Sequence, residues 1–373
     1  MGANGNTLAD LSARRSNHFN LIRMLAAIAV LISHSYPLAL GPPAVDPLTD
    51  LIGFSLGELA VVTFFGVSGF FISMSRDRAG GSLDYFCARF LRIYPGLTVV
   101  LLLTTFLLGA ICTTLTLNEY LSDRETYRYV SGNLSLFGMR FSLPGVFTDN
   151  PLPGINGSLW TLFYEVLLYV LVGALGAIHL FTGRRFLGFL LAYGCLYVTF
   201  KLAALHIPSF AELSRVQAFF ASSFPFVIGM LFYRYRQTIK LRLWCLVPLL
   251  GLATWSWHGD YFFECLVMAW VYLIFVLGFA NNPWLDSYNQ LGDYSYGVYI
   301  YAFPIQELLA HIQKGIGPLG MIAEALPIVL IAAVLSWHLI EKPSMSLRRN
   351  FALQLGLYTA ALKGIWSKRE PSK

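Results

Sequence analysis

Apolar stretches of about twenty residues recur along almost the whole chain and alternate with short polar segments. A helix needs about 20 such residues to cross the hydrocarbon core of a bilayer, which is roughly 30 Å thick. The pattern therefore predicts an all-α, polytopic integral membrane protein with about ten transmembrane helices. The predicted spans are 19–40, 51–74, 95–115, 158–180, 186–206, 214–233, 241–257, 261–279, 291–313 and 318–340.

Two of these spans have the weakest support. The span 241–257 is short, and 291–313 contains Asp293, Gln306 and Glu307 among its apolar residues. Polar side chains inside a bilayer are costly, so a span that holds three of them needs partners for them.

Three segments lie outside this pattern. Residues 82–94 alternate apolar side chains with arginines and stop at Pro95, which predicts a short interfacial helix leading into the third span. The long polar break 118–157 is rich in Gly, Pro and Asn, and we expect it to cover a site. We expect residues 1–350 to form one membrane domain and 351–373 to be a basic cytoplasmic tail.

Composition agrees with this picture. Of the 373 residues, 56% are hydrophobic and only 12% are charged, whereas about a quarter are charged in a soluble domain. The net charge of +6 does not indicate nucleic acid as a partner, because Lys and Arg lie between the apolar spans instead of clustering on one solvent-exposed face. Membrane lipid is the expected partner. The five Cys form no CxxC pair, and we expect them to pack without metal or disulfide.

The distribution of Lys and Arg predicts the orientation of the chain. With a cytoplasmic N-terminus, the outer face receives far fewer of these residues than the inner face, and the even number of spans returns the C-terminus inside. The first run is too long for a cleaved signal peptide. The outer residues would be Arg124, Arg128, Arg140, Lys201, Arg215 and Lys314. The inner ones would be Arg14, Arg15, Arg76, Arg78, Arg89, Arg92, Arg184, Arg185, Arg234, Arg236, Lys240, Arg242 and those of the tail.

The first span carries two ionisable residues, Arg23 and His34. Eleven residues correspond to three helical turns plus about 20°, so both side chains lie on one face and about 16 Å apart along the axis. This face offers an anion-binding group near the cytoplasm and a proton acceptor toward the outer side. Alternatively, Arg23 extends to the headgroups and His34 is a hydrogen-bonded core residue.

The fourth span carries Glu165, which should lie about 10 Å below the outer surface and at a depth similar to that of His34. A buried carboxylate at the level of an imidazole suggests an orienting or proton-sharing pair. The alternative is that Glu165 bonds to Trp160 or Tyr164 and only fixes packing. At the inner end, Arg23 should lie at the depth of the arginines at 89 and 92, although the positive-inside rule alone would also place arginines there.

Six short motifs, in order along the chain, resemble those of the membrane acyltransferase-3 family. The first is LIRMLAAIAVLISHS, which contains Arg23 and His34. No single motif is specific, but their order and the number of spans together identify the chain as a member of this family. The others are FFGVSGFFI at 64–72, ARFLRIYP at 88–95, GSLWTLFYE at 157–165, LGDYSYGVYIYAFPI at 291–305 and IEKP at 340–343.

The resemblance implies transfer of an acyl group, commonly acetyl, to a hydroxyl of an extracytoplasmic carbohydrate such as exopolysaccharide, O-antigen or lipo-oligosaccharide. Acetyl-CoA would be the donor substrate, with no permanently bound cofactor, and the protein would be a multi-pass protein of the inner membrane. Many relatives carry a His before the late-span proline, where this chain has Phe303-Pro304, so we assign no role there. Some relatives carry a fused extracytoplasmic hydrolase-like domain, and we expect any such partner to be a separate protein or absent.

On this basis Arg23, Arg89 and Arg92 are predicted to hold the phosphates of acyl-CoA, because the guanidinium fork suits bidentate phosphate recognition. His34 is predicted to be the general base, since the ordinary pKa of histidine is near 6.5, and an acyl-His intermediate is the competing mechanism. We predict that Glu165 is a second catalytic residue, which orients His34 or stabilises its charge. The residues assigned to substrate binding are Ser68, Gly69, Trp160 and Tyr164.

A transporter or flippase of a carbohydrate or a lipid-linked intermediate is the rival function. Transporters also contain buried charges and helices interrupted by Gly and Pro. However, the two halves of this sequence show no matching pair of broken segments, which such proteins commonly have. A structural scaffold explains still less, because it needs no Arg and His on one face of a span.

We predict that both termini are cytoplasmic and that residues 118–157 lie outside. A cysteine introduced near Lys368 should react with a membrane-impermeant thiol reagent only from the inner side of sealed vesicles. Labelling of that cysteine from the outer side would overturn the topology.

Overall fold

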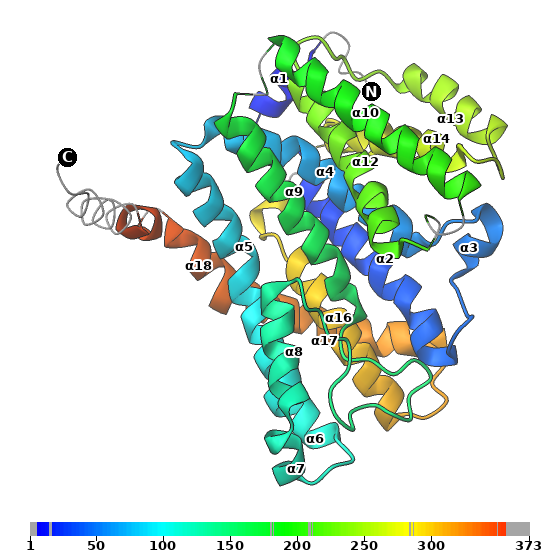
Figure 1. Cartoon of the computed structure of the whole chain (residues 1–373), viewed down its shortest axis with the longest axis vertical. Coiled ribbons are helices and arrows are strands. Elements are labelled where there is room, and N and C mark those ends of the chain that lie inside the picture. Colours follow the sequence, from blue (N-terminus) through cyan, green and yellow to red (C-terminus); the bar gives the residue numbers. More distant parts are fainter. Residues whose placement is uncertain are drawn as a thin grey trace, which may run out of the picture.

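The computed structural model describes residues 6–355, apart from 15, 16, 180, 182, 208, 209, 211, 283, 284, 286 and 349. Of the predicted basic tail, 356–373 lie outside the described residues. Helices make up most of the described chain (Figure 1), and none of the described residues belongs to a β-strand, although Thr113 and Val146 form an isolated bridge.

Each predicted span corresponds to a helix of the structure. Seven helical stretches are long and apolar enough to cross a membrane, while α13 and α14 are shorter and α16 contains polar residues. The all-α membrane fold is therefore confirmed. The helices are α2 (Phe19–Leu40), α4 (Leu56–Arg78), α5 (Ser82–Leu102), α9 (Trp160–Ala177), α10 (Gly183–His206), α12 (Ser214–Arg234), α13 (Leu246–Trp255), α14 (Phe262–Gly278), α16 (Ser295–Ile312) and α17 (Pro318–Ser336).

Shorter elements extend or connect these helices. A π-helix, η1 (Leu103–Gly109), continues α5 into α6 (Ala110–Cys112), and a second one, η5 (Trp337–Glu341), continues α17 into α18 (Lys342–Ser346). Insertions of π-helix are often found at functional sites. The remaining short elements are α1 (Leu8–Ala13), α3 (Pro47–Ile52), α7 (Leu117–Ser122), α8 (Arg124–Ser135), η2 (Gly157–Leu159), η3 (Leu243–Cys245) and η4 (Ser287–Gln290).

The prediction of a separate interfacial helix at 82–94 is wrong. Residues 82–112 form one continuous helical stretch that passes through Pro95. Proline removes one backbone donor, and neighbouring helices can satisfy the groups that it frees. Beside the proline, the Tyr296 hydroxyl of α16 donates to the Ile93 carbonyl at 2.7 Å, so α16 packs against α5 at this point.

Helix α4 lies in the middle of the bundle, where it contacts α2, α9, α12 and α14 (Figure 1). Its contact with α12 depends on glycines. A Cβ on Gly69 would lie 1.9 Å from the Phe226 carbonyl oxygen, and one on Gly229 would lie 2.1 Å from the Gly66 carbonyl oxygen. Small residues allow helix backbones in membranes to approach closely, and this approach replaces the hydrophobic driving force available in water.

The polar residues that weakened the prediction of α16 all have partners. Gln306 donates from Nε2 to the Leu31 carbonyl at 2.8 Å and to Ser35 Oγ at 2.7 Å, so it holds α16 against α2. Glu307 accepts from the side-chain amide of Asn150 at 2.5 Å. The third residue, Asp293, precedes the helix and belongs to the site described below.

The polar segment 113–157 lies against the bundle in two parts. Helices α7 and α8 lie beside the lower end of α5 in Figure 1, where the Tyr120 hydroxyl donates to the Thr105 carbonyl at 2.8 Å. The second part lies on α16, because Asn156 donates to the Ile300 carbonyl at 2.8 Å and a Cβ on Gly157 would meet the Phe303 ring at 2.7 Å. The segment thus fixes the position of the N-terminal end of α9.

We predict that Gly69→Ala destabilises the protein, because the added methyl group would overlap the α12 backbone. Overpacking typically costs about 1–3 kcal/mol and occasionally more. Gly188→Ala in α10 is the matched control, since its Cβ would meet no atom within 4 Å and Ala favours a helix. Thermal unfolding of both variants in detergent checks this prediction, and equal midpoints would contradict the packing role of Gly69.

Candidate functional site

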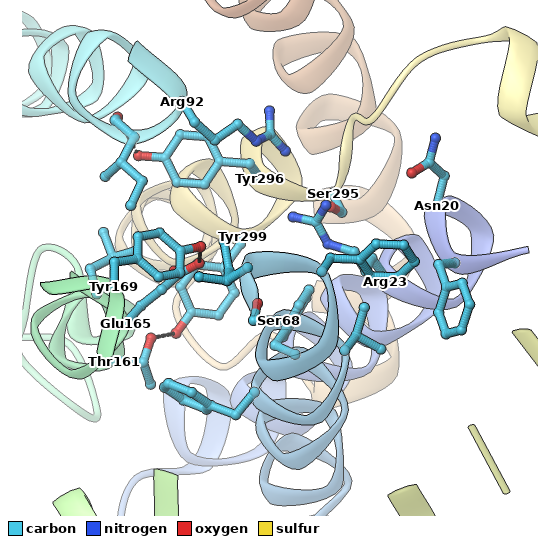
Figure 2. Close-up of a pocket in the computed structure, with 18 of the residues that line it drawn as sticks. Asn20, Arg23, Ser68, Arg92, Thr161, Glu165, Tyr169, Ser295, Tyr296 and Tyr299 are labelled. Carbon is cyan, nitrogen blue, oxygen red and sulfur yellow. Dashed lines mark hydrogen bonds between the residues drawn. The ribbon is translucent and has the colours of Figure 1, made fainter. Parts of the chain in front are cut away.

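A cavity of about 470 Å³, here named the arginine cavity, lies among α2, α4, α5, α9 and α16 (Figure 2). Figure 2 shows the guanidinium groups of Arg23 and Arg92 on one side of it and the α9 side chains on the other. Its polar lining includes Arg23, Ser68, Arg89, Arg92, Thr161, Glu165, Tyr169, Tyr296 and Tyr299.

Two arginines of this cavity share a carboxylate. Arg23 Nη1 lies 2.5 Å and Arg92 Nη2 lies 2.7 Å from the same Asp293 oxygen. The other Asp293 oxygen accepts from Ser295 Oγ at 2.5 Å. A side chain just before α16 thus joins α2 to α5 through charge-assisted hydrogen bonds, which are the strong ones.

Arg92 has a second ion pair, with Glu341. The distance from Arg92 Nη1 to Glu341 Oε2 is 3.0 Å, and Ser336 Oγ donates to the other Glu341 oxygen at 3.0 Å. Glu341 is the last residue of the π-helix η5 and is 1% exposed. The guanidinium also lies 5.6 Å from the ring centroids of Tyr296 and Trp337. Arg92 is therefore fixed by ion pairs and by aromatic contacts.

Arg89 differs from the other two arginines. Its guanidinium lies 5.8 Å from the ring centroid of Tyr169. Its Nε is buried without a hydrogen-bond partner, and no salt bridge of Arg89 occurs among the described residues. A charged donor group at a cavity wall favours an anion, because an unpaired buried charge is costly.

The α9 wall of the arginine cavity contains Glu165. Its carboxylate accepts a short hydrogen bond from the Tyr169 hydroxyl, one turn further along the helix. Thr161 lies one turn before it on the same face, as Figure 2 shows. Spacing of four residues places side chains above one another on a helix, which explains why the three residues line one wall.

A second cavity of about 270 Å³, here named the histidine pocket, contains His34. The imidazole ring packs edge-to-face on Phe303 at a centroid distance of 5.4 Å. Its Nδ1 lies 3.5 Å from the Oγ of Ser158, which belongs to η2 just before α9. The other walls include Trp160 and Glu58, so the pocket contains an aromatic and an acidic side chain besides the imidazole.

The residue next to His34 fixes the end of α2. Ser33 Oγ donates to Asp46 at 2.6 Å, and Asp46 also accepts from the backbone N–H groups of Leu48 at 3.1 Å and Leu56 at 3.0 Å. Asp46 is 2% exposed. One buried carboxylate therefore joins α2 to the starts of α3 and α4, which limits the positions available to the imidazole.

The structure brings together several residues predicted from sequence. Arg23, Arg89 and Arg92 line one cavity with Ser68, whereas His34 and Trp160 line the other. Arg23 and His34, predicted to lie about 16 Å apart on one face of a helix, thus line one each of two neighbouring cavities.

Three predicted residues have other surroundings. Glu165 lies in the arginine cavity and not with His34, because the α9 face that carries it points toward the arginines. Gly69 faces the α12 backbone, so its missing side chain serves helix packing and not the approach of a ligand. Tyr164 lines neither cavity; its hydroxyl donates to the Arg215 carbonyl at 3.0 Å.

Sequence reasoning missed three further residues of the site. Asp293 was visible as an acidic residue in a weak span, and Glu341 as part of the IEKP motif. Their role was hidden because both bind Arg92, which is 201 residues from Asp293 and 249 residues from Glu341 in sequence. Tyr299 gave no signal, since it lies in an aromatic run.

Comparisons with known proteins agree on one family. Residues 17–341 match a family model described as an acyltransferase domain. The chain is 33% identical to an "O-acetyl transferase" of Shigella phage Sf6 over 88% of this chain and 96% of the relative. It is 27% identical to "Nodulation protein 10" of Rhizobium leguminosarum bv. viciae, over 91% of this chain and 96% of the relative. No solved structure matches the chain.

We predict that Asp293→Asn destabilises the protein by about 3 kcal/mol, since removing one partner of a buried ion pair leaves charge uncompensated. Asp84→Asn is the control, because the side chains of the Asp84–Arg348 pair are 32% and 40% exposed and such pairs contribute at most about 1 kcal/mol. Thermal unfolding in detergent measures both effects. A loss for Asp293→Asn no larger than that of the control would show that the shared carboxylate is not needed.

Proposed function

The chain belongs to the acyltransferase-3 family. From this premise we propose that it is a membrane O-acyltransferase, which transfers the acetyl group of acetyl-CoA to a hydroxyl of an extracytoplasmic carbohydrate. The observation that carries the proposal is the arrangement along α2. Arg23 lines a cavity with two further arginines, and His34 lines an adjacent pocket. A donor with several phosphates needs the cationic side chains of the first cavity, and an acceptor hydroxyl needs a proton acceptor such as the imidazole of the second.

The arginine cavity is suited to the phosphates of the donor. Arg89 has an unpaired Nε, while Arg23 and Arg92 are held by Asp293. We infer that Arg89 makes the first phosphate contact and that the other two arginines, pre-oriented by the carboxylate, add charge-assisted hydrogen bonds. The pantetheine arm then extends over the roughly 16 Å between Arg23 and His34.

In the proposed reaction, His34 accepts the proton of the acceptor hydroxyl while the hydroxyl oxygen attacks the carbonyl carbon of the thioester. The new C–O bond forms and the C–S bond breaks. The proton then passes from His34 to the departing thiolate, so the products are the O-acetyl ester and free CoA. The Ser158 hydroxyl, 3.5 Å from Nδ1, orients the imidazole in place of Glu165.

The surroundings of His34 support a carbohydrate as acceptor. Trp160 and Phe54 supply aromatic surface and Glu58 supplies a carboxylate in the same pocket. A sugar ring stacks on aromatic faces through its C–H groups and donates hydroxyl protons to carboxylates. A relative named "O-acetyl transferase" supports oxygen as the acceptor atom and acetyl as the group. We further propose that the protein resides in the inner membrane, with membrane lipid around it.

Glu165 has a different proposed role from the one that its depth suggested. Its carboxylate accepts from Tyr169 and lines the wall opposite the arginines (Figure 2). We infer that this wall meets the polar amide groups of the pantetheine arm, because a carboxylate accepts N–H hydrogen bonds.

We predict that His34→Ala abolishes O-acetylation while the protein still inserts and folds. Loss of a general base typically lowers the rate about 10²- to 10⁴-fold. His206→Ala is the control, because His206 is exposed at the end of α10. Ester groups on the cell-surface glycan, and transfer from labelled acetyl-CoA in membranes, measure the effect. Parental esterification by His34→Ala would refute this mechanism and favour the transporter reading.

A further inference from the structure

The arginine cavity and the histidine pocket have a common wall. Tyr299 and Val61 line both cavities, one from α16 and the other from α4. A group that moves from the arginines to His34 must therefore pass these two side chains. Val61 is small and aliphatic, whereas Tyr299 presents a ring and a hydroxyl, so the aromatic residue determines whether the wall is closed.

The Tyr299 side chain is held in this wall by specific contacts. Its hydroxyl donates to the Ser158 carbonyl at 2.7 Å and lies 2.5 Å from Thr161 Oγ1, as Figure 2 shows for the Thr161 contact. The single proton of the phenol goes to the carbonyl, so the Thr161 hydroxyl donates to the phenol oxygen. The ring packs edge-to-face on Phe64 at 5.9 Å.

We propose that Tyr299 is a hydrogen-bonded septum that separates the donor phosphates from the acceptor pocket and swings aside to admit the acyl group. The inference rests on the proposed function for the identity of the passing group. Tyr299 is a positioning residue and not a catalytic one, because it does not touch the reacting atoms while closed. The closed septum keeps water of the histidine pocket away from the thioester.

The position of Ser158 links the septum to His34. The Ser158 carbonyl accepts from Tyr299, while the hydroxyl of the same residue lies 3.5 Å from the imidazole. Backbone motion at Ser158 therefore changes both contacts together. Opening of the septum and reorientation of His34 should accompany one another, so that the imidazole is free to meet the hydroxyl when the thioester arrives.

Access of a small reagent to each cavity tests the septum without any acyl transfer. The reporters are Ser68→Cys, which lines only the arginine cavity, and Val30→Cys, which lines only the histidine pocket. Each is placed in a background in which the five native cysteines are replaced. The probe is anionic 2-sulfonatoethyl methanethiosulfonate, added to the cytoplasmic face of inside-out vesicles, because the arginines favour an anion.

With Tyr299 present, Ser68→Cys should react rapidly and Val30→Cys slowly. Tyr299→Ala should accelerate modification of Val30→Cys at least about tenfold without changing the rate for Ser68→Cys. Tyr299→Phe keeps the ring but loses the hydroxyl contacts. Each lost hydrogen bond is expected to increase the population of the open state by a factor of about 2 to 10. Its rate should therefore lie between those of the parent and Tyr299→Ala.

Tyr296→Ala is the matched control, because it removes a tyrosine ring of the same helix that lines only the arginine cavity. This control should leave the rate for Val30→Cys unchanged. Equal rates for Val30→Cys in the Tyr299→Ala and Tyr296→Ala proteins, or rapid modification of Val30→Cys in the parent, would overturn the septum. If Val30→Cys reacts at the parental rate in the Tyr299→Phe protein, the hydroxyl hydrogen bonds do not keep the septum closed.

These rates involve no donor and no acceptor, so they are independent of the proposed reaction. Failure of His34→Ala to lower O-acetylation would contradict the proposed function and leave the septum standing. Conversely, rapid reaction of the reagent with Val30→Cys in the parent would refute the septum but would not contradict donor binding by the arginines.

Discussion

The need to neutralise buried charge organises this membrane fold. Transfer of an ion out of water costs several kcal/mol, and this cost is recovered only with a close partner and further hydrogen bonds. Arg23, Arg92, Asp293 and Glu341 meet this condition by joining α2, α5, the start of α16 and η5 in one network. Four segments that are far apart in sequence thereby acquire a common reference point at one end of the bundle.

The other end of α2 is held by hydrogen bonds of neutral groups and one buried carboxylate. Asp46 binds Ser33 and two backbone N–H groups, and Gln306 binds the Leu31 carbonyl and the Ser35 hydroxyl on either side of Ser33. Between these two ends, glycines bring α4 against α12. The result is a rigid frame around two adjacent cavities, in which the arginines and His34 are separated along α2 and by the side chain of Tyr299.

The site that results combines rigid and movable parts. Arg92 is fixed by two carboxylates and two aromatic rings, and such pre-orientation lowers the entropy lost when a phosphate binds. Arg89 lacks an ion-pair partner among the described residues. The phenol of Tyr299 is held by its two hydroxyl contacts and one edge-to-face contact, which must break for the proposed septum to open.

The sequence by itself determined the spans, because apolar length decides whether a helix can cross a bilayer. It also predicted that Arg23 and His34 of α2 share one face, since spacing along a helix fixes the shared face. Only the tertiary structure decided which carboxylates hold the arginines, that Glu165 faces them, that Gly69 contacts α12, and that α5 continues through its proline. Those outcomes depend on contacts between distant segments, which the periodicity of a single helix does not contain.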